Sequence, residues 1–405
     1  MTNEIKNVPE LRFPEFKEEW VEKKLGEITS KISDGIHSTP TYDSNGDIYF
    51  INGNNLVNGR IDFKTSKKIS VQEFNKYKNY LEAKNTLLLS INGTIGNIAK
   101  YEGENILLGK SAAYINVVSK FISRCYIFYY LQISKIYESF LRELTGTTIK
   151  NLSLKSIKNI IVYISELDEQ QKIGNFFSKL DRQIELEEQK LSLLEEQKKG
   201  YMQQIFSRQF LFENEKGDTD YSWRNFKIKD IFSKIESGNR LPKTNLVEGN
   251  IPYVIAQTTN NGVFMHISED TLDYHKNKLK LFKKGSITIS IDNPEAMFIQ
   301  EMDFFTSNVM RVIHNENLKR GSHIFIMESL KKLTQSYNWS VKFSGPIIMD
   351  STVKFPVYND NKVNWNVVNK IGDFFNTFEI RINRQSDKIK LLEERKKGFL
   401  QKMFI

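Results

Sequence analysis

Ile173 to Ser207 reads IGNFFSKLDRQIELEEQKLSLLEEQKKGYMQQIFS, and Ile371 to Ile405 reads IGDFFNTFEIRINRQSDKIKLLEERKKGFLQKMFI. Aligned without a gap, these two stretches are identical at 15 of their 35 positions. The identities include Gly174 with Gly372, and a glycine inside a helix costs about 1 kcal/mol. Such a residue does not recur through a shared helical composition alone. We therefore interpret the chain as an internal repeat.

Both stretches predict a long helix with one apolar stripe. Apolar side chains recur at alternating steps of three and four residues, which is the pattern of a coiled-coil seam. The first helix carries a net charge of −1 and the second of +3, so their opposite signs favour pairing with each other. The predicted seam residues are Phe177, Leu180, Ile184, Leu191 and Leu194 in the first helix, and Phe375, Phe378, Ile382, Ile389 and Leu392 in the second.

An alternative interpretation is that each stretch is an ordinary amphipathic helix packed on its own domain. A helix of 35 residues is about 52 Å long, which exceeds the usual length in a globular domain. The length therefore favours a paired spacer.

The repeat continues more faintly outside the helices, at a constant offset of 203 residues. Beyond the matched positions the two halves diverge, so they share a scaffold and present different surfaces. The matches are Trp20 with Trp223, SKISDG at Ser30–Gly35 with SKIESG at Ser233–Gly238, and the pair Asn58-Gly59 with Asn261-Gly262.

These boundaries predict a mixed α/β fold with an internal pseudo-twofold repeat. A chain of 405 residues suits two or three domains. We predict two globular domains at residues 1–172 and 208–370, which alternate with the helices at 173–207 and 371–405.

Composition indicates an anionic partner and no metal chemistry. The net charge is +9, of which the two helices contribute only +2, so most of the excess lies in the globular segments. Cys125 is the only cysteine, and the five histidines show no metal-ligand spacing. The first ten residues lack the apolar core of a signal peptide, and the most apolar stretch, Cys125–Ile133, is too short to span a bilayer. We expect a cytoplasmic protein without a membrane partner.

The order of these features resembles the specificity subunits of Type I restriction–modification systems. In that family, two variable recognition domains are each followed by a similar long helix, and the resemblance covers essentially the whole chain. The second half departs from the pattern, because SGNRLPKTN at Ser237–Asn245 does not repeat the His-Ser-Thr-Pro phrase of the first. The phrases that carry the resemblance are PELRFPEF at Pro9–Phe16, SDGIHSTPTY at Ser33–Tyr42, INGNNLVNG at Ile51–Gly59, INGTIGN at Ile91–Asn97, TGTTIKNLS at Thr145–Ser153 and LDEQQKIGNFFSKLDRQI at Leu167–Ile184.

The resemblance implies a non-catalytic subunit that selects a DNA sequence for its partners. Each domain would read one half of a split duplex site, and the two helices would run antiparallel and hold the domains a set distance apart. Two methyltransferase subunits would modify adenine N6, and two restriction and translocase subunits would join them. S-adenosylmethionine, ATP and Mg²⁺ would be used by those partners, with no cofactor in this chain.

The side chains that could read DNA are polar groups in loops that carry glycine or other turn residues. Base edges are read by paired donors and acceptors, whereas phosphates take Lys, Arg and backbone N–H groups. The candidates in the first half are His37, Ser38, Thr39, Tyr42, Asn52, Asn54, Asn55, Asn92, Thr94, Thr147 and Thr148. Those in the second half are Arg240, Lys243, Gln257, Thr258, Thr259, Asn260, Asn293, Asn308 and Lys342. Asn and Gly are equally the ordinary residues of tight turns, so for any single position turn chemistry stays an alternative.

Enzyme interpretations find little support in the sequence. The stretch GENILLGKS at Gly103–Ser111 has five residues between its glycines where a phosphate-binding loop needs four, and Ile106–Leu108 reads as a strand. No Pro-Pro pair is present for an adenine methyltransferase motif, since Asn293-Pro294 is followed by Glu295. Two alternatives remain, a fused or degenerate restriction–modification enzyme and a coiled-coil scaffold without DNA recognition.

Overall fold

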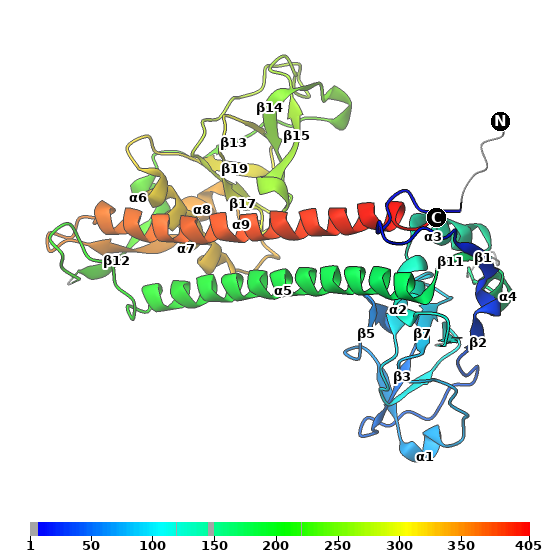
Figure 1. The fold of residues 1–405 in the computed structure, drawn as a ribbon. Coiled ribbons are helices and arrows are strands. Elements are labelled where there is room, and N and C mark those ends of the chain that lie inside the picture. The colour runs from blue at the N-terminus through cyan, green and yellow to red at the C-terminus, as the bar shows by residue number, and fades with distance from the viewer. Residues whose placement is uncertain (1–6, 119, 145–149, 220) are drawn as a thin grey trace. The chain divides into compact units, whose positions relative to one another are not determined.

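The computed structural model describes residues 7–118, 120–144, 150–219 and 221–405, which fold as two compact units. Unit 1 comprises residues 1–189 and 387–405, and unit 2 comprises residues 190–386. Two long helices, α5 (Leu167–Phe206) and α9 (Trp365–Lys402), run through both units (Figure 1). Each unit therefore consists of one globular part and a portion of each long helix.

The globular part of unit 1 is built from small sheets and short helices. An antiparallel sheet has the strand order β2-β10-β7-β8, and a second sheet has the order β6-β3-β9, in which β3 and β9 are parallel. Two strand pairs, β1-β11 and β4-β5, complete it. The strands are β1 (Val21–Lys24), β2 (Thr29–Asp34), β3 (Ile48–Ile51), β4 (Leu56–Val57), β5 (Arg60–Ile61), β6 (Lys67–Ile69), β7 (Thr86–Ser90), β8 (Ile98–Lys100), β9 (Ile106–Leu108), β10 (Ala112–Val117) and β11 (Ile161–Ile164). The short helices are η1 (Leu25–Glu27), η2 (Gly53–Asn55), α1 (Val71–Phe74), α2 (Arg124–Tyr130), α3 (Ser134–Arg142) and α4 (Leu154–Lys158).

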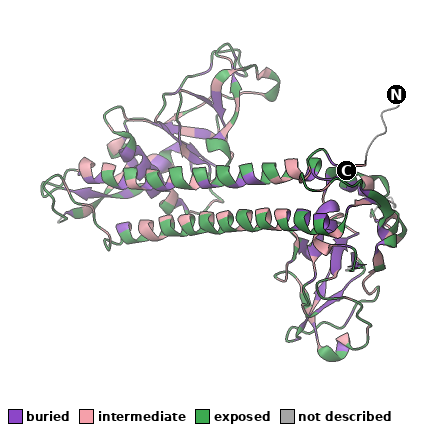
Figure 2. Ribbon diagram, viewed as in Figure 1, coloured by how far each residue is buried: buried purple, intermediate pink, exposed green. Residues whose placement is uncertain are grey.

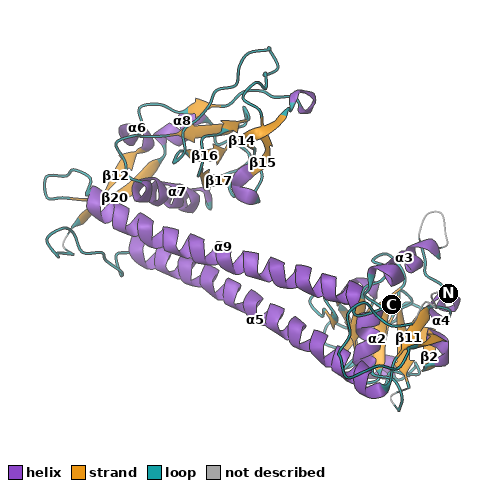
Figure 3. Ribbon diagram, turned by 45° about the horizontal axis from the view of Figure 1, so that its top comes forward, coloured by secondary structure: helices purple, strands orange, loops and turns teal. Residues whose placement is uncertain are grey.

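Unit 2 has the corresponding strand order. Its sheets are β13-β19-β16-β17 and β15-β14-β18, with β14 and β18 parallel, and β12 pairs with β20. The strands are β12 (Ser222–Lys227), β13 (Glu236–Ser237), β14 (Glu248–Val254), β15 (Val263–Ile267), β16 (Ile287–Ser290), β17 (Met297–Ile299), β18 (Phe305–Thr306), β19 (Met310–Ile313) and β20 (Thr352–Val357). The helices are α6 (Ile228–Ile231), η3 (Lys243–Asn245), η4 (Asn260–Gly262), α7 (Arg320–Thr334) and α8 (Gly345–Asp350) (Figure 3).

Residues matched by the 203-residue offset occupy the same structural places. A Cβ on Gly35 would collide with the carbonyl of Leu108, and a Cβ on Gly238 would collide with the carbonyl of Thr306. Glycine is therefore required at the end of β2 and at the end of β13. The expectation of a mixed α/β chain with two repeated parts is confirmed.

The long helices contribute to the core of each unit. In unit 1, Phe177 of α5 stacks on Phe404 at 5.8 Å, and Phe404 also lies against Trp20, which is 1% exposed. In unit 2, Ile205 of α5 and Phe375 of α9 are fully buried in the main core. Strands β7 and β16 are buried along their whole length (Figure 2).

The predicted starts of the two long helices need correction. Both helices begin six residues earlier than predicted, at Leu167 and Trp365 in place of Ile173 and Ile371. The prediction rested on similarity between the repeats, and LDEQQK and WNVVNK share too little to extend it. The division into two compact units passes through both helices, and the predicted division into four segments stays a prediction.

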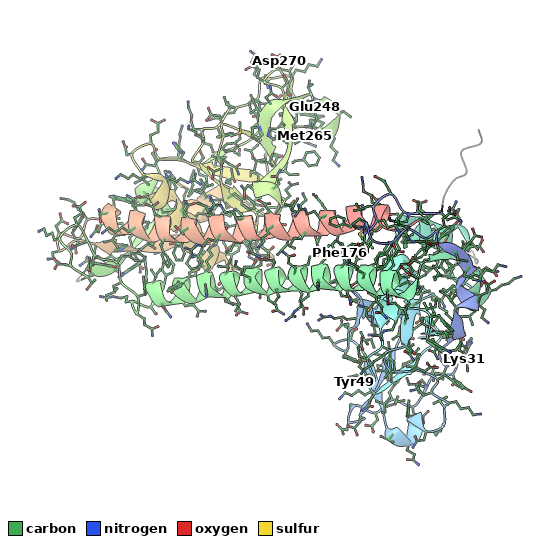
Figure 4. The ribbon with its side chains drawn as sticks, viewed as in Figure 1. Lys31, Tyr49, Phe176, Glu248, Met265 and Asp270 are labelled. Carbon is green, nitrogen blue, oxygen red and sulfur yellow. The ribbon has the colours of Figure 1, made fainter. Side chains whose placement is uncertain are left out.

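All ten predicted seam residues are buried or half-buried, as a seam requires. Two leucines of the helices that lie off the seam are exposed, Leu193 at 57% and Leu391 at 55%. In unit 1, Phe176, which is labelled in Figure 4, belongs to α5. Its ring meets that of Phe399 at 5.1 Å, and Lys396 Nζ lies 2.7 Å from Asp181.

Unit 2 repeats these two contacts with its own residues. Tyr201 meets Phe374 at 5.2 Å, and Lys198 forms an ion pair with Glu379. Within each unit, therefore, the later residues of one helix meet the earlier residues of the other.

A buried histidine in unit 2 predicts acid sensitivity. His323 in α7 is 2% exposed, its Nε2 lies 3.3 Å from the Asn315 amide, and its ring stacks on His314 at 5.4 Å. Burial, with a smaller contribution from His314, lowers the pKa of His323 from 6.5 to about 4. Because the unfolded state binds this proton first, the histidine stabilises unit 2 fully above pH 6.5 and progressively less down to pH 4. The loss amounts to about 3 kcal/mol.

We therefore expect the variant His323→Gln to flatten the decline in stability between pH 6.5 and 4. Hydrogen exchange of α7 at several pH values measures this, with His266→Gln as the control because His266 is exposed. An identical pH dependence in His323→Gln and the wild type would contradict the assignment.

Candidate nucleic-acid interface

In unit 1 the predicted loops converge on the turn Gly109–Ser111, which follows β9. The Ile36 amide donates to the Leu108 carbonyl at 2.7 Å, which brings the first loop, the one that carries His37 to Tyr42, to this turn. The Gly53 amide donates to Ser111 Oγ at 2.9 Å, and Ser111 Oγ donates to Asn52 Oδ1 at 3.0 Å. Ser111 therefore holds the second loop, which contains Asn52 to Asn55, against this turn.

The third loop, which contains Asn92 to Thr94, joins the same cluster through the threonine. Thr94 Oγ1 donates to the Gly53 carbonyl at 3.2 Å, and the Leu152 amide donates to the Ile91 carbonyl at 2.9 Å. The structure thus brings together loops that lie far apart in the sequence. Exposed predicted residues in this unit are His37, Ser38, Thr39, Tyr42, Asn54 and Thr94.

Two exposed side chains of the first loop already have partners in the protein. His37 Nε2 lies 2.8 Å from Asp34, and the His37 side chain is 73% exposed. Lys67 Nζ lies 4.2 Å above the ring of Tyr42, which is a cation–π distance. Both predicted residues remain accessible to a ligand.

The prediction was wrong for Asn55. Its side chain is 2% exposed, accepts from the Asn52 amide at 2.9 Å and donates to the Asp62 carbonyl and to Thr65 Oγ1, both at 3.2 Å. Asn55 therefore closes the turn of η2, donates both of its amide hydrogens within the protein, and is too buried to reach a base. Its sequence neighbour Asn54 is exposed.

The remaining candidates of unit 1 are less informative. Asn92 is half-buried and forms a β-bridge with Asn151. Thr147 and Thr148 lie outside the described residues.

Sequence reasoning missed Lys110. Its side chain is exposed in the convergent turn, and no ion pair within the described residues engages it. The Gly-Lys-Ser triplet was considered only as part of a nucleotide-binding loop, although the same residues suit any phosphate. The accompanying prediction that Ile106–Leu108 is a strand is confirmed, because it is β9.

Unit 2 gathers the corresponding loops in the same way. The Asn239 amide donates to the Thr306 carbonyl at 3.1 Å, and Thr306 Oγ1 donates to the Val254 carbonyl at 2.8 Å. The Phe343 amide donates to the Ile291 carbonyl at 2.8 Å, as Leu152 does to Ile91 in unit 1. The exposed predicted residues are Arg240, Lys243, Thr258, Thr259, Asn260, Asn308 and Lys342, of which Lys342 lies 3.5 Å from Asp292.

Turn chemistry accounts for three of the predicted amides in unit 2. Gln257 Nε2 donates to the Val263 carbonyl at 2.8 Å, and Asn260 Nδ2 donates to the same carbonyl at 3.1 Å. Asn293 Oδ1 accepts from the Glu295 amide at 3.1 Å. All three side chains form hydrogen bonds within their own loops. Gln257 and Asn293 are also half-buried, so their prediction as base readers needs correction, whereas Asn260 is exposed.

Arg240 is exposed, and an aromatic ring restrains its guanidinium. Its guanidinium carbon lies 5.0 Å from the centre of the Tyr274 ring, and the Tyr274 amide donates to the Arg240 carbonyl at 3.0 Å. The ring restricts the guanidinium while its N–H groups stay exposed. A fixed guanidinium can donate two parallel hydrogen bonds to guanine O6 and N7.

Comparisons with known proteins place this geometry in a family. The family described as the Type I restriction modification DNA specificity domain matches residues 17–196 and again residues 221–389. The chain belongs to this family. The two matches contain the two loop clusters, one in each unit.

Proteins similar in sequence carry names that agree. The chain is 24% identical over 348 residues to the Type I restriction enzyme MjaIX specificity subunit of Methanocaldococcus jannaschii, a match that covers 80% of this chain and 78% of that protein. It is 26% identical over 241 residues to the MjaVIII specificity subunit of the same organism, covering 57% and 52%. It is 28% identical over 144 residues to the Type II restriction enzyme specificity subunit S.BcgI of Heyndrickxia coagulans, covering 35% and 40%. The last two matches span about half or less of those relatives.

The fold is shared with solved structures from Type I restriction–modification systems. The S subunit of a Type I restriction–modification system from M. genitalium has a TM-score of 0.62 at 16% identity, covering 98% of this chain and 99% of that one. A chain from a structure of the Type I restriction–modification system, described in terms of complex assembly and conformational transition, has a TM-score of 0.54 at 13% identity, covering 97% and 99%. At these identities the similarity concerns the fold alone.

Proposed function

We propose that this chain is a specificity subunit that reads a bipartite duplex DNA site, one half-site with each unit. The observation that carries the proposal is the repeated loop cluster. In both units the same strands end in converging loops, yet the exposed side chains differ, with His37 and Asn54 in one and Arg240 in the other. A repeated scaffold with different readers suits a site whose two halves differ in sequence.

The two long helices are proposed as an antiparallel coiled-coil spacer related by an internal pseudo-twofold repeat. Support comes from equivalent contacts within each unit, Phe176 with Phe399 in unit 1 and Tyr201 with Phe374 in unit 2. Because both helices run through both units, a spacer made from them would couple the separation of the half-sites to helix length.

The chemistry is assigned to partner proteins. We propose that two methyltransferase subunits and two restriction and translocase subunits assemble with the chain, and that these use S-adenosylmethionine, ATP and Mg²⁺. The chain itself is proposed to be non-catalytic and cytoplasmic. No helix within the described residues has the length and apolar character needed to cross a membrane.

Substitutions in one unit are expected to relax one half-site only. In Arg240→Ala, loss of a bidentate base contact costs about 1–3 kcal/mol of discrimination at one base pair, which is roughly 5- to 150-fold. In Asn54→Ala, the loss is expected at the other half-site. Both side chains are exposed, so neither change should unfold the chain.

The measurement is single-molecule mapping of methylated adenines in cells that carry the complete system. Arg240→Ala and Asn54→Ala serve as matched controls for each other. If either single variant relaxed both half-sites equally, the assignment of one reader to each unit would be wrong.

A further inference from the structure

A lysine-rich loop in unit 2 adjoins the proposed reading surface. It connects β15 to β16 and reads TLDYHKNKLKLFKKG from Thr271 to Gly285, with five lysines against one aspartate. The aspartate, Asp273, is 6% exposed. From Thr271 to Gly285 the exposed charge is therefore entirely positive, whereas the same connection between β15 and β16 begins with two exposed acidic residues, Glu269 and Asp270. All five lysines are exposed: Lys276, Lys278, Lys280, Lys283 and Lys284.

Apolar residues of the same loop anchor it to unit 2. Leu279 is 9% exposed in the cluster that contains Tyr253, and Phe282 stacks on Phe304 at 5.6 Å. Since these residues alternate with the lysines, burying them directs the lysines toward solvent. The packing of these apolar residues thus fixes the backbone of the loop and leaves its lysines exposed.

Asn239, next to Arg240 in the sequence, connects the Thr271–Gly285 loop to the loop that carries Arg240. Asn239 Nδ2 donates to Asp273 Oδ2 at 2.9 Å, and Asn239 Oδ1 accepts from the Lys280 amide at 3.1 Å. Asp273 also accepts from the amides of His275 and Asn277, at 2.8 and 2.9 Å. The hydrogen bond from the Asn277 amide and that from Asn239 hold the pKa of Asp273 below its usual value.

Most of these lysines form no ion pair within the described residues. Lys280 pairs with Glu236, but no ion pair within the described part of the chain engages the other four. The counterpart loop in unit 1, from Val71 to Asn85, has three lysines against two glutamates, and Lys76 pairs with Glu73 at 2.5 Å. Among the described residues, this loop of unit 2 thus has four lysines without an ion pair, and its counterpart in unit 1 has two, Lys78 and Lys84.

We propose that the Thr271–Gly285 loop binds backbone phosphates of duplex DNA next to the half-site that Arg240 reads, and that Asn239 positions it. This inference rests on the proposed function. A lysine is a mobile point charge that suits phosphates, whereas base reading needs fixed paired donors. The loop therefore supplies affinity that does not depend on sequence.

The main test replaces the four unpaired lysines with glutamine, in K276Q/K278Q/K283Q/K284Q. The full chain, assembled with its methyltransferase partner, is titrated with a duplex that carries the mapped site at several salt concentrations. Each lost phosphate contact lowers the slope of log affinity against log salt by about 0.9. If all four lysines contact phosphates, the wild type loses about 100-fold more affinity than the variant over a fourfold rise in salt. The methylated sequence should not change.

Two further variants separate positioning from charge. Asn239→Ala keeps every lysine but releases the loop, so its salt slope should also fall, by less than in the quadruple variant. The control K216Q/K354Q removes two exposed lysines elsewhere in unit 2 and should leave the slope unchanged.

Three results would overturn the inference in distinguishable ways. An unchanged slope in the quadruple variant, with specific binding intact, would place the loop away from DNA. Loss of assembly with the methyltransferase would assign the lysines to a protein partner. A wild-type complex without sequence-specific binding would overturn the proposed function itself.

Discussion

Replacing Lys198 with methionine is expected to destabilise unit 2 by up to about 3–5 kcal/mol, because it leaves the buried carboxylate of Glu328 with only the more distant Lys331, at 3.6 Å, as an ion-pair partner. Lys198 Nζ lies 3.0 Å from Glu328, which is 1% exposed, and it also pairs with Glu379. Burial opposes its charge, but Glu328 and Glu379 together raise the pKa of Lys198. Hydrogen exchange of peptides from α7, which carries Glu328, measures the loss within unit 2.

The repeat supplies a matched control in unit 1. Lys396 is the counterpart of Lys198, but it pairs with Asp181, whose side chain is 36% exposed, and lies near Tyr129. Lys396→Met should therefore cost about 1 kcal/mol or less. Adding Glu328→Gln to Lys198→Met should recover much of the loss, since Glu328 is the more buried of the two carboxylates that Lys198 contacts and the double variant makes it neutral. Equal effects of the two methionine variants would show that the buried glutamate does not decide the cost.

The sequence was most informative where physical constraints recur in both halves. Gly35 and Gly238 could be matched because no other residue fits beside the facing carbonyl, and the seam residues because one stripe must face the protein. Asn58-Gly59 and Asn261-Gly262 could be matched because each pair lies in the corresponding turn of its own unit, and all four residues adopt positive φ angles there. In each case the backbone allows few alternatives.

The site was less predictable because side chains of one type have different roles. Asn54 and Asn55 are neighbours in a single loop, yet one is exposed and the other is buried and fully hydrogen-bonded. Only the direction of each side chain distinguishes them. The lysine-rich loop was missed because it lacks the Asn and Gly pattern that guided the search, although its local charge was visible in the sequence.

Lengthening both long helices by one heptad is expected to widen the gap between the half-sites by about three base pairs without changing either half-site. Seven residues add about 10 Å to a helix, and duplex DNA rises about 3.4 Å per base pair. The division between units crosses α5 after Gln189 and α9 after Ser386. Duplicating residues 190–196 and 387–393 at these points keeps the pairings within each unit.

The contacts within the units explain why both helices must be lengthened. Glu187 pairs with Lys388 at 2.5 Å in unit 1, and Lys198 pairs with Glu379 in unit 2. A heptad added to α5 alone moves the α5 residues of one unit away from the α9 residues that they contact. Insertions of equal length in α5 and α9 keep the contacts of both units in place. The chain lengthened only in α5 is therefore the control, and we expect it to lose affinity for every spacing.

Mapping of methylated adenines in cells reads out the spacing directly. Seven residues turn a helix about 20° short of two full turns, so the seam is nearly preserved. Three base pairs rotate one half-site about 100° around the duplex, given roughly 10.5 base pairs per turn, so some loss of affinity accompanies the wider gap. The spacing is therefore the decisive quantity. An active complex with an unchanged gap would show that the helices do not set the separation, and altered half-sites would show that they take part in reading bases.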